Sequence, residues 1–530
     1  MIERKTPPHD TDVAADQDDI IAFLADPATY GPSREKVERV ETHGAIVFLA
    51  GDRVHKLKKA VRFPYMDFST LERRRAACLR EIEINRPQAP QVYIDAAPVT
   101  REPDGTFAIG GRGEPVDWVV RMNRFDQAGL FDRLADEGRL DAPLLIALTD
   151  EIRRFHARAE VDRDADGVSW IRPIVAELAE ALASAADIFG AGAGERFSQA
   201  ATAELDRSGH CLRLRARRNC VRRCHGDLHL RNIVLIDGRP VLFDAIEFDE
   251  ALATIDTLYD LAFLIMDLSQ RGMGPQANLV LNRYLHLSDS AIDLYGLAAM
   301  PLFLACRAGV RAMVAMNRAR QADGAAAEAA ADEARHYCAH ALGMLARGKP
   351  RLIAVGGLSG TGKTTLAAAL APGIGAAPGA VHLRSDLERK IMFGAAETER
   401  LGPEAYTPQA SARVYDVLRQ KARIALVAGA GVIVDAVFST AEERRDIEAA
   451  ARSAEADFTG LWLNADQATM VARVEGRRGD ASDATADVVR DQIARGTGPV
   501  GWTCIDAGGS PADTLAAARS ALGQADEADR

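Results

Sequence analysis

The stretch GGLSGTGKTT, residues 356–365, constrains the fold of this chain more than any other feature. It fits the pattern GxxxxGK[ST], with the apolar run LIAVG before it and the helical run TLAAALA after it. Glycines in such a loop let successive backbone N–H groups converge on phosphate oxygens at a helix N-terminus, where the helix dipole also favours an anion. The pattern therefore predicts a strand, a phosphate-binding loop and a helix in direct succession.

The sequence around this loop alternates short apolar runs with amphipathic ones. The strand candidates are RLIAVGG, AVHLRSD, GVIVDAVF, FTGLWLN and WTCIDAGG. Strands that alternate with helices are typical of a parallel sheet covered by helices on its faces. We therefore predict an α/β domain of the P-loop NTPase type over residues 350–530.

Within this domain the loop itself supplies the candidate nucleotide contacts. Lys363 is expected to reach the β and γ phosphates of ATP, and the Thr364 hydroxyl to bind Mg²⁺. Asp435 ends the apolar run VIVD, the position of the acid that holds the metal through water. The predicted loop contacts are Gly357, Ser359, Gly360, Thr361, Gly362, Lys363, Thr364 and Thr365.

A second segment, HGDLHLRNIVLIDGRPVLFDAIEF at residues 225–248, predicts a different site. Asp237-Gly238 between two apolar runs is a strong two-residue hairpin signal, and the resulting register sets Asn232 opposite Phe243. Asp244 then lies next to Asn232 at the open end of the hairpin, where oxygen ligands suit Mg²⁺. Asp227, on the preceding loop, could accept a proton from a substrate hydroxyl.

A chain of 530 residues is long enough for at least two domains. Residues 1–18 are charged and contain proline, and we expect a flexible tail there. Residues 19–345 read as strands first and helices afterwards, which predicts an α+β domain with a small sheet-rich lobe and a larger helical lobe. An Ala-rich helix ending at GKP is the expected connector to the domain at 350–530.

The segment with His225, Gly226, Asp227, Asn232 and Asp244 resembles the aminoglycoside phosphotransferase and choline-kinase-like family, whose members are related to protein kinases. The resemblance implies a bilobal kinase-like fold, with Asp227 as catalytic base and Asn232 and Asp244 as Mg²⁺ ligands. It also implies that two later acids, Asp256 and Asp260, are structural. The sequence departs from the family after Asp244, where AIEF leaves Glu247 open as a further metal or substrate contact.

The same resemblance implies a lysine on an early strand that is held by a helix glutamate. A hairpin turn near Gly51-Asp52 would place Lys56 and Lys58 on one strand face, and we favour Lys56 with Lys58 as the alternative. In the following helix, STLERRRAACLREIEIN, the expected N-cap is Ser69. The lysine's expected partner is Glu81 or Glu83.

The C-terminal half resembles small-molecule P-loop kinases, a group that includes gluconate and shikimate kinases, polynucleotide kinase and zeta-type toxins, with an AAA-type ATP-binding domain. By this resemblance Asp386 of RSDLERK would position or deprotonate the acceptor hydroxyl, with Arg384 and Arg389 near the substrate. A lid over the phosphates would be formed by Arg473, Arg477 and Arg478. Asp483 and Gln492 are candidate substrate or adenine contacts without an assigned role.

Composition excludes several other classes. The net charge of −11 argues against a general nucleic-acid binder, and the N-terminus lacks the apolar core of a signal peptide. No run approaches the roughly 18 uninterrupted apolar residues that a membrane helix requires, so we expect a cytoplasmic protein. Seven scattered cysteines do not form a disulfide framework. Zinc is not expected at Cys220, Cys224 and His225, because no second ligand pair accompanies them.

The leading hypothesis is a bifunctional ATP- and Mg²⁺-dependent kinase, each half transferring a phosphoryl group to a small-molecule hydroxyl such as that of a sugar, aminoglycoside or nucleoside. One alternative keeps a single catalytic half and makes the other a nucleotide-binding regulator. Another makes the C-terminal half a polynucleotide end-kinase, but we do not expect nucleic acid as a partner, because a basic and aromatic track is missing. The acceptor and the oligomeric state stay open.

Overall fold

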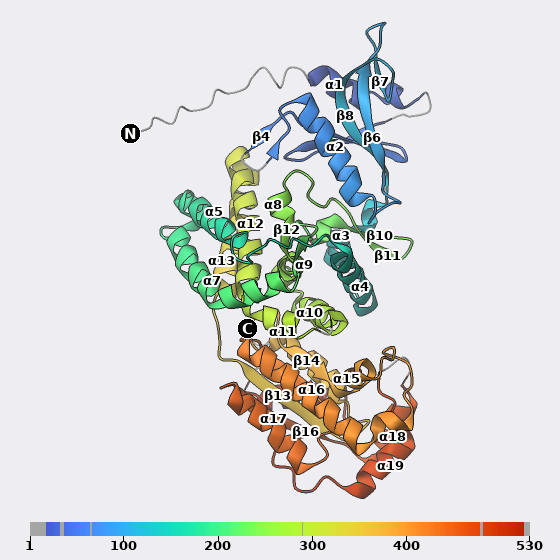
Figure 1. Cartoon of the computed structure of the whole chain (residues 1–530), viewed down its shortest axis with the longest axis vertical. Coiled ribbons are helices and arrows are strands. Elements are labelled where there is room, and N and C mark those ends of the chain that lie inside the picture. The colour runs from blue at the N-terminus through green and yellow to red at the C-terminus, as the bar shows by residue number, and fades with distance from the viewer. Residues whose placement is uncertain (1–16, 32–35, 64–65, 289, 478–480, 524–530) are drawn as a thin grey trace. The chain divides into compact units, whose positions relative to one another are not determined.

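The computed structural model describes residues 17–31, 36–63, 66–288, 290–477 and 481–523 (Figure 1). The chain forms two compact units. The first comprises Met1–Asp162 and Val221–Asp260, and the second comprises Arg163–Cys220 and Leu261–Arg530. Each unit therefore contains two separate segments of the sequence.

The first unit contains a six-stranded antiparallel sheet with the strand order β1-β2-β3-β8-β6-β7. Ala50 pairs with Arg53, which confirms the predicted turn at Gly51-Asp52. The sequence predicted β2, β3 and β8, whereas β1, β6 and β7 were not predicted. The strands are β1 Glu38–Glu41, β2 Ala45–Ala50, β3 Arg53–Lys58, β6 Tyr93–Arg101, β7 Phe107–Ile109 and β8 Glu114–Asn123, with the separate pair β4 Arg62–Phe63 and β5 Met66–Asp67.

Helix α2, Leu71–Asn85, packs on this sheet, and its Cys78 joins the core formed by Tyr93 and Val120. The predicted N-cap at Ser69 is wrong by one residue. The Thr70 hydroxyl accepts the hydrogen bond from the backbone N–H of Arg73, whereas the Ser69 hydroxyl donates to Asp67. The helix therefore begins one residue later than expected.

The sequence predicted a flexible tail over residues 1–18. Residues 1–16 lie outside the described residues, and residues 17 and 18 are folded. Helix α1 begins at Asp18 and ends at Ala25. Gln17 is buried, and its side-chain amide donates to the Lys58 carbonyl at 3.0 Å and to Asp117 at 2.7 Å. The prediction of a flexible tail is therefore wrong at Gln17 and Asp18, since both belong to the folded unit.

The hairpin predicted at Asp237-Gly238 is confirmed. Both turn residues have positive φ, 50° and 73°, as a type I′ turn requires. Strand β10 pairs with β11, and helix α4 packs on the hairpin (Figure 1). The elements of this part are α3 Phe131–Asp136, α4 Ala142–Arg158, β9 Val221–Arg223, β10 Ile233–Ile236, β11 Arg239–Leu242, α8 Glu250–Ala253 and β12 Thr254–Asp256, of which β9 and β12 form a second antiparallel pair.

The second unit contains a group of helices and a parallel sheet. The helices are α5 Ile171–Ala183, α6 Ala186–Phe189, α7 Ala193–Arg217, α10 Gly274–Ser288, α11 Ala291–Gly296, α12 Met300–Gln321 and α13 Gly324–Met344, to which most of α9, Thr257–Gln270, also belongs. The stretch Ala291–Gln321 is long and apolar enough to cross a membrane by length and composition alone. Two-thirds of its apolar window, 67%, is buried inside the protein, as in the core helix of a soluble protein.

The sheet of the second unit has five parallel strands in the order β14-β15-β13-β16-β17, and helices flank it (Figure 1). All five strands lie where the sequence predicted them. Together with the strands-then-helices order of the preceding part, this sheet confirms the predicted fold class. The elements are β13 Arg351–Gly357, α14 Lys363–Leu370, β14 Val381–Arg384, α15 Ser385–Met392, α16 Pro408–Val427, β15 Val432–Asp435, α17 Ala441–Ser453, β16 Asp457–Asn464, α18 Gln467–Glu475, α19 Ala486–Arg495, β17 Thr503–Asp506 and α20 Pro511–Ala521.

Strand β14 is an edge of this sheet, and helix α10 covers part of that edge. Asn278 and Asn282 donate from their side-chain amides to the Ala380 carbonyl at 3.0 and 3.1 Å. The Asn282 side-chain oxygen accepts from the backbone N–H of His382 at 2.7 Å. The two asparagines thus satisfy backbone groups that have no neighbouring strand on that side.

Candidate active sites

Lys56 of strand β3 contacts both Glu81 of α2 and Asp244, in the loop that follows the β10–β11 hairpin. The Lys56 ammonium lies 2.9 Å from a Glu81 oxygen and 2.5 Å from an Asp244 oxygen. Burial alone would lower the pKa of Lys56, but the charges of Asp244 and Glu81 raise it well above its ordinary value. Glu83, the alternative partner, instead pairs with Arg80. Of the two glutamates considered, the structure therefore brings Glu81 to Lys56.

The hairpin register brings the predicted metal ligands to its open end. The backbone N–H of Phe243 donates to the Asn232 carbonyl at 3.0 Å, as the two-residue turn requires. Asp244 follows with a φ of 62°, a conformation that aspartate tolerates better than most residues. Although burial opposes it, the charge of Lys56 lowers the pKa of the Asp244 carboxyl. Asp244 is therefore ionised in the neutral pH range and available as a hard oxygen ligand.

Asp227 and Asn232 are in direct contact. The Asn232 side-chain amide donates to the carboxylate and to the backbone carbonyl of Asp227, at 2.9 Å in each case. His229 lies 3.3 Å from the same carboxylate oxygen. Because the nitrogen of the Asn232 amide faces Asp227, its oxygen is the atom that this side chain could offer to a metal.

His225 and Asp260 hold the loop that carries Asp227. The His225 Nε2–H donates to the Phe243 carbonyl at 2.9 Å, and burial lowers the pKa of the ring, so the imidazole is neutral. Asp260 accepts from the backbone N–H groups of His225 and Gly226 at 3.2 and 2.8 Å. These contacts match the structural role implied for Asp260.

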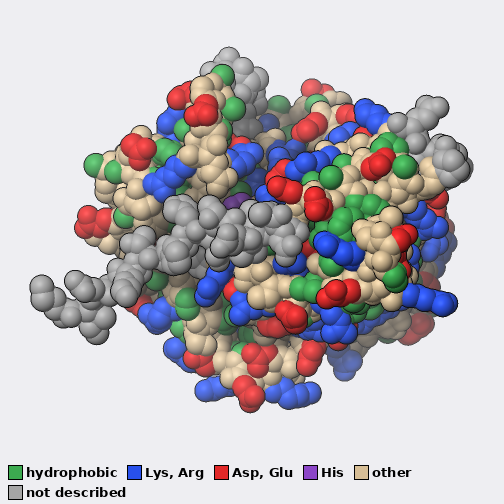
Figure 2. All heavy atoms as spheres, turned by 90° about the horizontal axis from the view of Figure 1, so that it is seen from above, with side chains coloured by type: hydrophobic (Ala, Val, Ile, Leu, Met, Phe, Trp, Pro, Cys, Tyr) green, Lys and Arg blue, Asp and Glu red, His purple; other side chains and the backbone are tan. Residues whose placement is uncertain are grey.

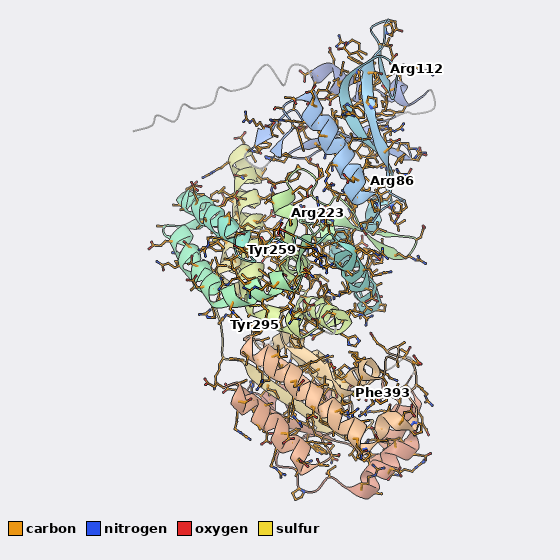
Figure 3. The ribbon with its side chains drawn as sticks, viewed as in Figure 1. Arg86, Arg112, Arg223, Tyr259, Tyr295 and Phe393 are labelled. Carbon is orange, nitrogen blue, oxygen red and sulfur yellow. The ribbon has the colours of Figure 1, made fainter. Side chains whose placement is uncertain are left out.

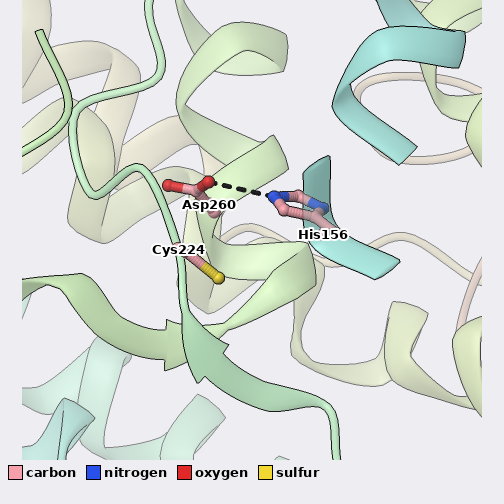
Figure 4. A group of neighbouring side chains, drawn as sticks. All are labelled: His156, Cys224 and Asp260. Carbon is pink, nitrogen blue, oxygen red and sulfur yellow. Dashed lines mark hydrogen bonds and ion pairs between the residues drawn. The ribbon is translucent and has the colours of Figure 1, made fainter. Parts of the chain in front are cut away.

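His156, Cys224 and Asp260 form a buried group whose possible ligand atoms lie within 4.8 Å of one another (Figure 4). Asp260 accepts a hydrogen bond from His156 at 3.0 Å, in addition to the two backbone bonds, and the Cys224 thiol donates to the Ile255 carbonyl. All three side chains thus have hydrogen-bond partners within the protein. The contacts indicate a structural role, and the expectation that zinc does not bind near Cys224 stays a prediction.

The glycine-rich loop leads into α14 as predicted. Gly362 has a φ of 89° and forms the N-cap of the helix, where a side chain would be strained. The Lys363 ammonium donates to the Leu358 carbonyl at 3.0 Å, which folds the lysine back over the loop. Burial lowers the pKa of Lys363, while Asp435 and Asp386 oppose the shift.

The Thr364 hydroxyl donates to Asp435, so the two predicted metal contacts meet directly. Burial would raise the pKa of Asp435, but the nearby imidazole of His382 and the charge of Lys363 keep it below its ordinary value. His382 lies on β14, and its Nε2 is 3.7 Å from the Asp435 carboxylate. This histidine was not predicted from the sequence, since nothing in β14 marks it as a partner of β15.

Asp386 lies in the first turn of α15 and is half-buried. Burial and the nearby charge of Asp435 raise its pKa above the ordinary range, although Lys363 works in the opposite direction. Arg389 donates to the Ala405 carbonyl and lies over the Tyr406 ring, 4.9 Å from its centre. A half-buried acid with a raised pKa near the charges of Asp435 and Lys363 is typical of a functional site, and its role as acceptor base stays a prediction.

Asp483 forms hydrogen bonds with three other residues of the protein. Its carboxylate accepts from the Lys390 ammonium at 2.8 and 2.9 Å, from the Tyr406 hydroxyl at 2.5 Å and from the backbone N–H of Leu401 at 3.1 Å. It therefore ties the segment after α15 to the segment before α19.

The predicted lid arginines are in different environments. Arg473 donates to the carbonyls of Ala507 and Gly509 at 2.7 and 2.9 Å, after strand β17. Arg477 lies near enough for its charge to contribute to the lowered pKa of Lys363, after burial. Arg478 lies outside the described residues. Contact of Arg473 and Arg477 with phosphates stays a prediction.

Several residues near the two sites make contacts that the sequence did not predict. Asn85 binds both backbone groups of Ala245, and the Tyr93 hydroxyl accepts from the backbone N–H of Asp244 at 3.1 Å. Gln492, left without a role above, accepts from the backbone N–H of Ser359 at 2.8 Å. Each joins segments far apart in the chain, a relationship that periodicity and motif spacing do not reveal.

Comparisons with known proteins follow the same division of the chain. A family model described as an AAA domain matches residues 352–499. A choline/ethanolamine kinase family protein from Mesorhizobium loti matches the N-terminal part, with 14% identity, 62% of this chain, 99% of that chain and a TM-score of 0.38. A gluconokinase from Sinorhizobium meliloti 1021 matches the C-terminal part, with 19% identity, 33% of this chain, 94% of that chain and a TM-score of 0.25. The AAA-domain match agrees with the AAA-type ATP-binding domain expected in the C-terminal half.

A relative matches along most of the chain. The protein Rv2004c of Mycobacterium tuberculosis strain H37Rv, described as uncharacterized, is 32% identical over 462 residues, which cover 86% of this chain and 89% of the relative. The chain belongs to the same family as this mycobacterial protein. Because the match exceeds the length of either half, the relative shares the combination of both parts.

Proposed function

We propose that the protein is a bifunctional ATP-dependent phosphotransferase, in which each half binds ATP with Mg²⁺ and transfers the γ-phosphoryl group to a small-molecule hydroxyl. The observation that carries the proposal is the Lys56 ammonium, shared between Glu81 of α2 and Asp244 of the hairpin loop. In kinase-like folds, a lysine paired with a helix glutamate contacts the phosphates, and a nearby aspartate binds the metal.

In the N-terminal site the donor set fits the proposed ligands. Asn232 and Asp244 offer an amide oxygen and a carboxylate oxygen, the hard ligands that Mg²⁺ prefers, and Lys56 would contact the phosphates. Bound Mg²⁺ would neutralise charge on the phosphate oxygens. Asp227, held by Asn232 and His229, would orient the acceptor hydroxyl and take its proton.

In the C-terminal site Lys363 and the loop N–H groups would bind the phosphates, while Thr364 and Asp435 would hold the metal. Gly360 supports this assignment, because a Cβ atom there would lie 2.4 Å from the Met470 carbonyl. Only glycine therefore fits the loop as it is folded. Asp386 would receive the proton of the second acceptor, since its raised pKa suits a base that must also release the proton.

The expected partners are small molecules. On the face shown in Figure 2, the described acidic and basic side chains are interspersed rather than gathered into a basic track, which supports small acceptors over nucleic acid. A cytoplasmic location and the absence of membrane partners are part of the proposal.

The test is phosphoryl transfer from radiolabelled ATP by the full chain to a panel of sugars, aminoglycosides and nucleosides. Asp227→Asn should abolish one set of labelled products and Lys363→Ala another, and the double variant should abolish both. Matched controls are Asp237→Asn, in the hairpin turn, and Lys349→Ala, an exposed lysine, which should retain both sets. Loss of all transfer in a single variant would favour one catalytic half with a regulatory partner. Transfer that survives the double variant would contradict the proposal.

A further inference from the structure

Lys58, the second lysine of strand β3, lies in a buried network of charges. Its ammonium pairs with Glu81 and with Glu247, and its side chain is only 2% exposed. Glu247 is 5% exposed in its side chain and follows Asp244 by three residues. The AIEF segment, where the sequence departs from the related family, therefore supplies a buried acid to the small lobe.

This network is not explained by packing alone. Removing an ammonium and two carboxylates from water is costly, and a buried ion pair is often no more stable than an apolar group of the same volume. Glu81 also has a partner already in Lys56. A buried ion network of this kind fixes the orientation of its members, so the groups around it indicate what it positions.

The charges form a closed chain of contacts. Glu81 uses Oε1 for Lys56 and Oε2 for Lys58, so both of its oxygens are held. Lys58 then contacts Glu247, and the backbone leads from Glu247 back to Asp244, which contacts Lys56. Burial lowers the pKa of Lys58, but the charges of Glu247 and Glu81 raise it overall, so this lysine stays charged.

Both ends of the second ion pair are fixed by further contacts. The side-chain amide of buried Gln17 donates to the Lys58 carbonyl. On the other side, Arg223, which is labelled in Figure 3, donates to the Ile246 carbonyl, next to Glu247. Asn85 holds Ala245 by two hydrogen bonds. The loop from Asp244 to Glu247 is therefore attached to α2 through Asn85, to β9 through Arg223 and to β3 through Lys58.

We propose that Lys58 and Glu247 are positioning residues that hold Glu81 and the Asp244 loop in place when the Lys56 ammonium moves from Asp244 to the nucleotide. This inference rests on the proposed function of the N-terminal site. Without the second pair, Lys56 would be the one cation in contact with Glu81 among the described residues, and Glu81 would follow it. With the second pair, Glu81 keeps one oxygen on Lys58, and Lys56 is presented to the phosphates at a fixed angle.

The experiment measures nucleotide affinity by isothermal titration calorimetry, with Mg²⁺ and a non-hydrolysable ATP analogue as the probe. The full chain carries Lys363→Ala, so that binding at the glycine-rich loop is weakened. In this background, the charge-neutral pair of changes Lys58→Met and Glu247→Gln should weaken binding about tenfold, the scale of couplings within one ion network. Unchanged affinity would overturn the inference.

The matched control is the neighbouring exposed pair, Lys59→Met with Glu41→Gln, which removes the same two charges and should leave affinity unchanged. Thermal unfolding without nucleotide reports whether each variant is folded. If the buried double variant does not fold, Glu247→Gln alone decides, since Lys58 keeps Glu81 as its partner there. A severalfold loss of affinity supports the positioning role, and wild-type affinity overturns it.

Two results separate this inference from the function on which it rests. If the Lys363→Ala background binds no nucleotide, or if Lys56→Ala does not weaken binding, the proposed N-terminal site is wrong. If Lys56→Ala weakens binding but the Lys58 and Glu247 changes do not, the site stands and the positioning role is wrong. Adding Glu81→Gln to the double variant should cause little further loss, because the three residues act as one unit.

Discussion

The Asn85 side chain, at the last residue of α2, binds both backbone groups of Ala245: it accepts from the N–H at 2.8 Å and donates to the carbonyl at 3.2 Å. The same helix carries Glu81 four residues earlier. One helix thus positions the acid that holds Lys56 and the loop that carries Asp244.

Replacing Asn85 by alanine should destabilise this loop. Two buried backbone groups lose their partners, at a cost of about 2 kcal/mol or more. Hydrogen exchange followed by mass spectrometry should show faster exchange in a peptide that covers residues 243–248. Asn85→Asp, which keeps the acceptor, should be intermediate, and Asn123→Ala, at an exposed asparagine, should exchange as the wild type does. Unchanged protection in Asn85→Ala would contradict this account.

Gln492 should compete with nucleotide for the glycine-rich loop. Its side-chain oxygen accepts from the Ser359 N–H, a donor within the predicted phosphate-binding loop. Gln492→Ala removes a hydrogen bond whose net worth is about 1 kcal/mol, so affinity for Mg²⁺ and ATP analogue should increase about fivefold. The measurement is calorimetric titration of the full chain carrying Lys56→Ala, with Gln467→Ala as control. Weaker binding would instead make Gln492 a nucleotide contact.

Asp386→Asn should raise the thermal stability of the fold and lower phosphoryl transfer by the C-terminal half. Burial and Asp435 raise the pKa of Asp386, so the folded protein binds this proton more tightly than the unfolded chain does. The stability from this group is complete below the unfolded pKa and is lost as the pH rises through the folded value. The amide variant avoids that loss, so its thermal unfolding temperature should exceed the wild-type value more at pH 7.5 than at pH 5. Transfer by the C-terminal half should fall at least a hundredfold, the lower range for a lost acid–base group.

The opposite pH dependence is expected at Glu397. Hydrogen bonds from His286 and Arg283 lower its pKa to about 2. A lowered carboxyl pKa stabilises the fold above the unfolded pKa, and this contribution is lost as the pH falls through the folded value. Glu397→Gln should therefore lower the unfolding temperature at pH 6, and by less at pH 3.5. Because Glu397 is partly exposed, the effect should be small. Glu475→Gln, at an exposed glutamate, is the control, and an equal effect of Glu397→Gln at both pH values would contradict the assignment.

The parts of the fold that the sequence predicted are those set by local rules. The Asp237-Gly238 turn determines which residues face each other, and Asn232 therefore meets Phe243 as expected. The five parallel strands follow from apolar runs of the right length. By contrast, β6 was missed because Pro98 interrupts its pattern, and α2 began at Leu71 because Thr70 caps it.

The sequence predicted individual residues of the two sites but not the contacts that orient them, because only the former follow from local patterns. Motif spacing indicated Lys56, Asp227, Lys363 and Asp435, although their roles stay predictions. It could not indicate that Lys58 and Glu247 would meet, because 189 residues separate them. The partners that orient a site come from tertiary contacts, and a single sequence records those contacts only as isolated polar residues in apolar surroundings.

Asn278 and Asn282 of α10 shield the outer edge of strand β14. A protein fragment that begins near residue 350 would lack α10 and present those backbone groups to other molecules. Such an edge is a template for intermolecular strand pairing. Solubility of the C-terminal half is thus a property of the longer polypeptide, and self-association is the expected fate of the half expressed by itself.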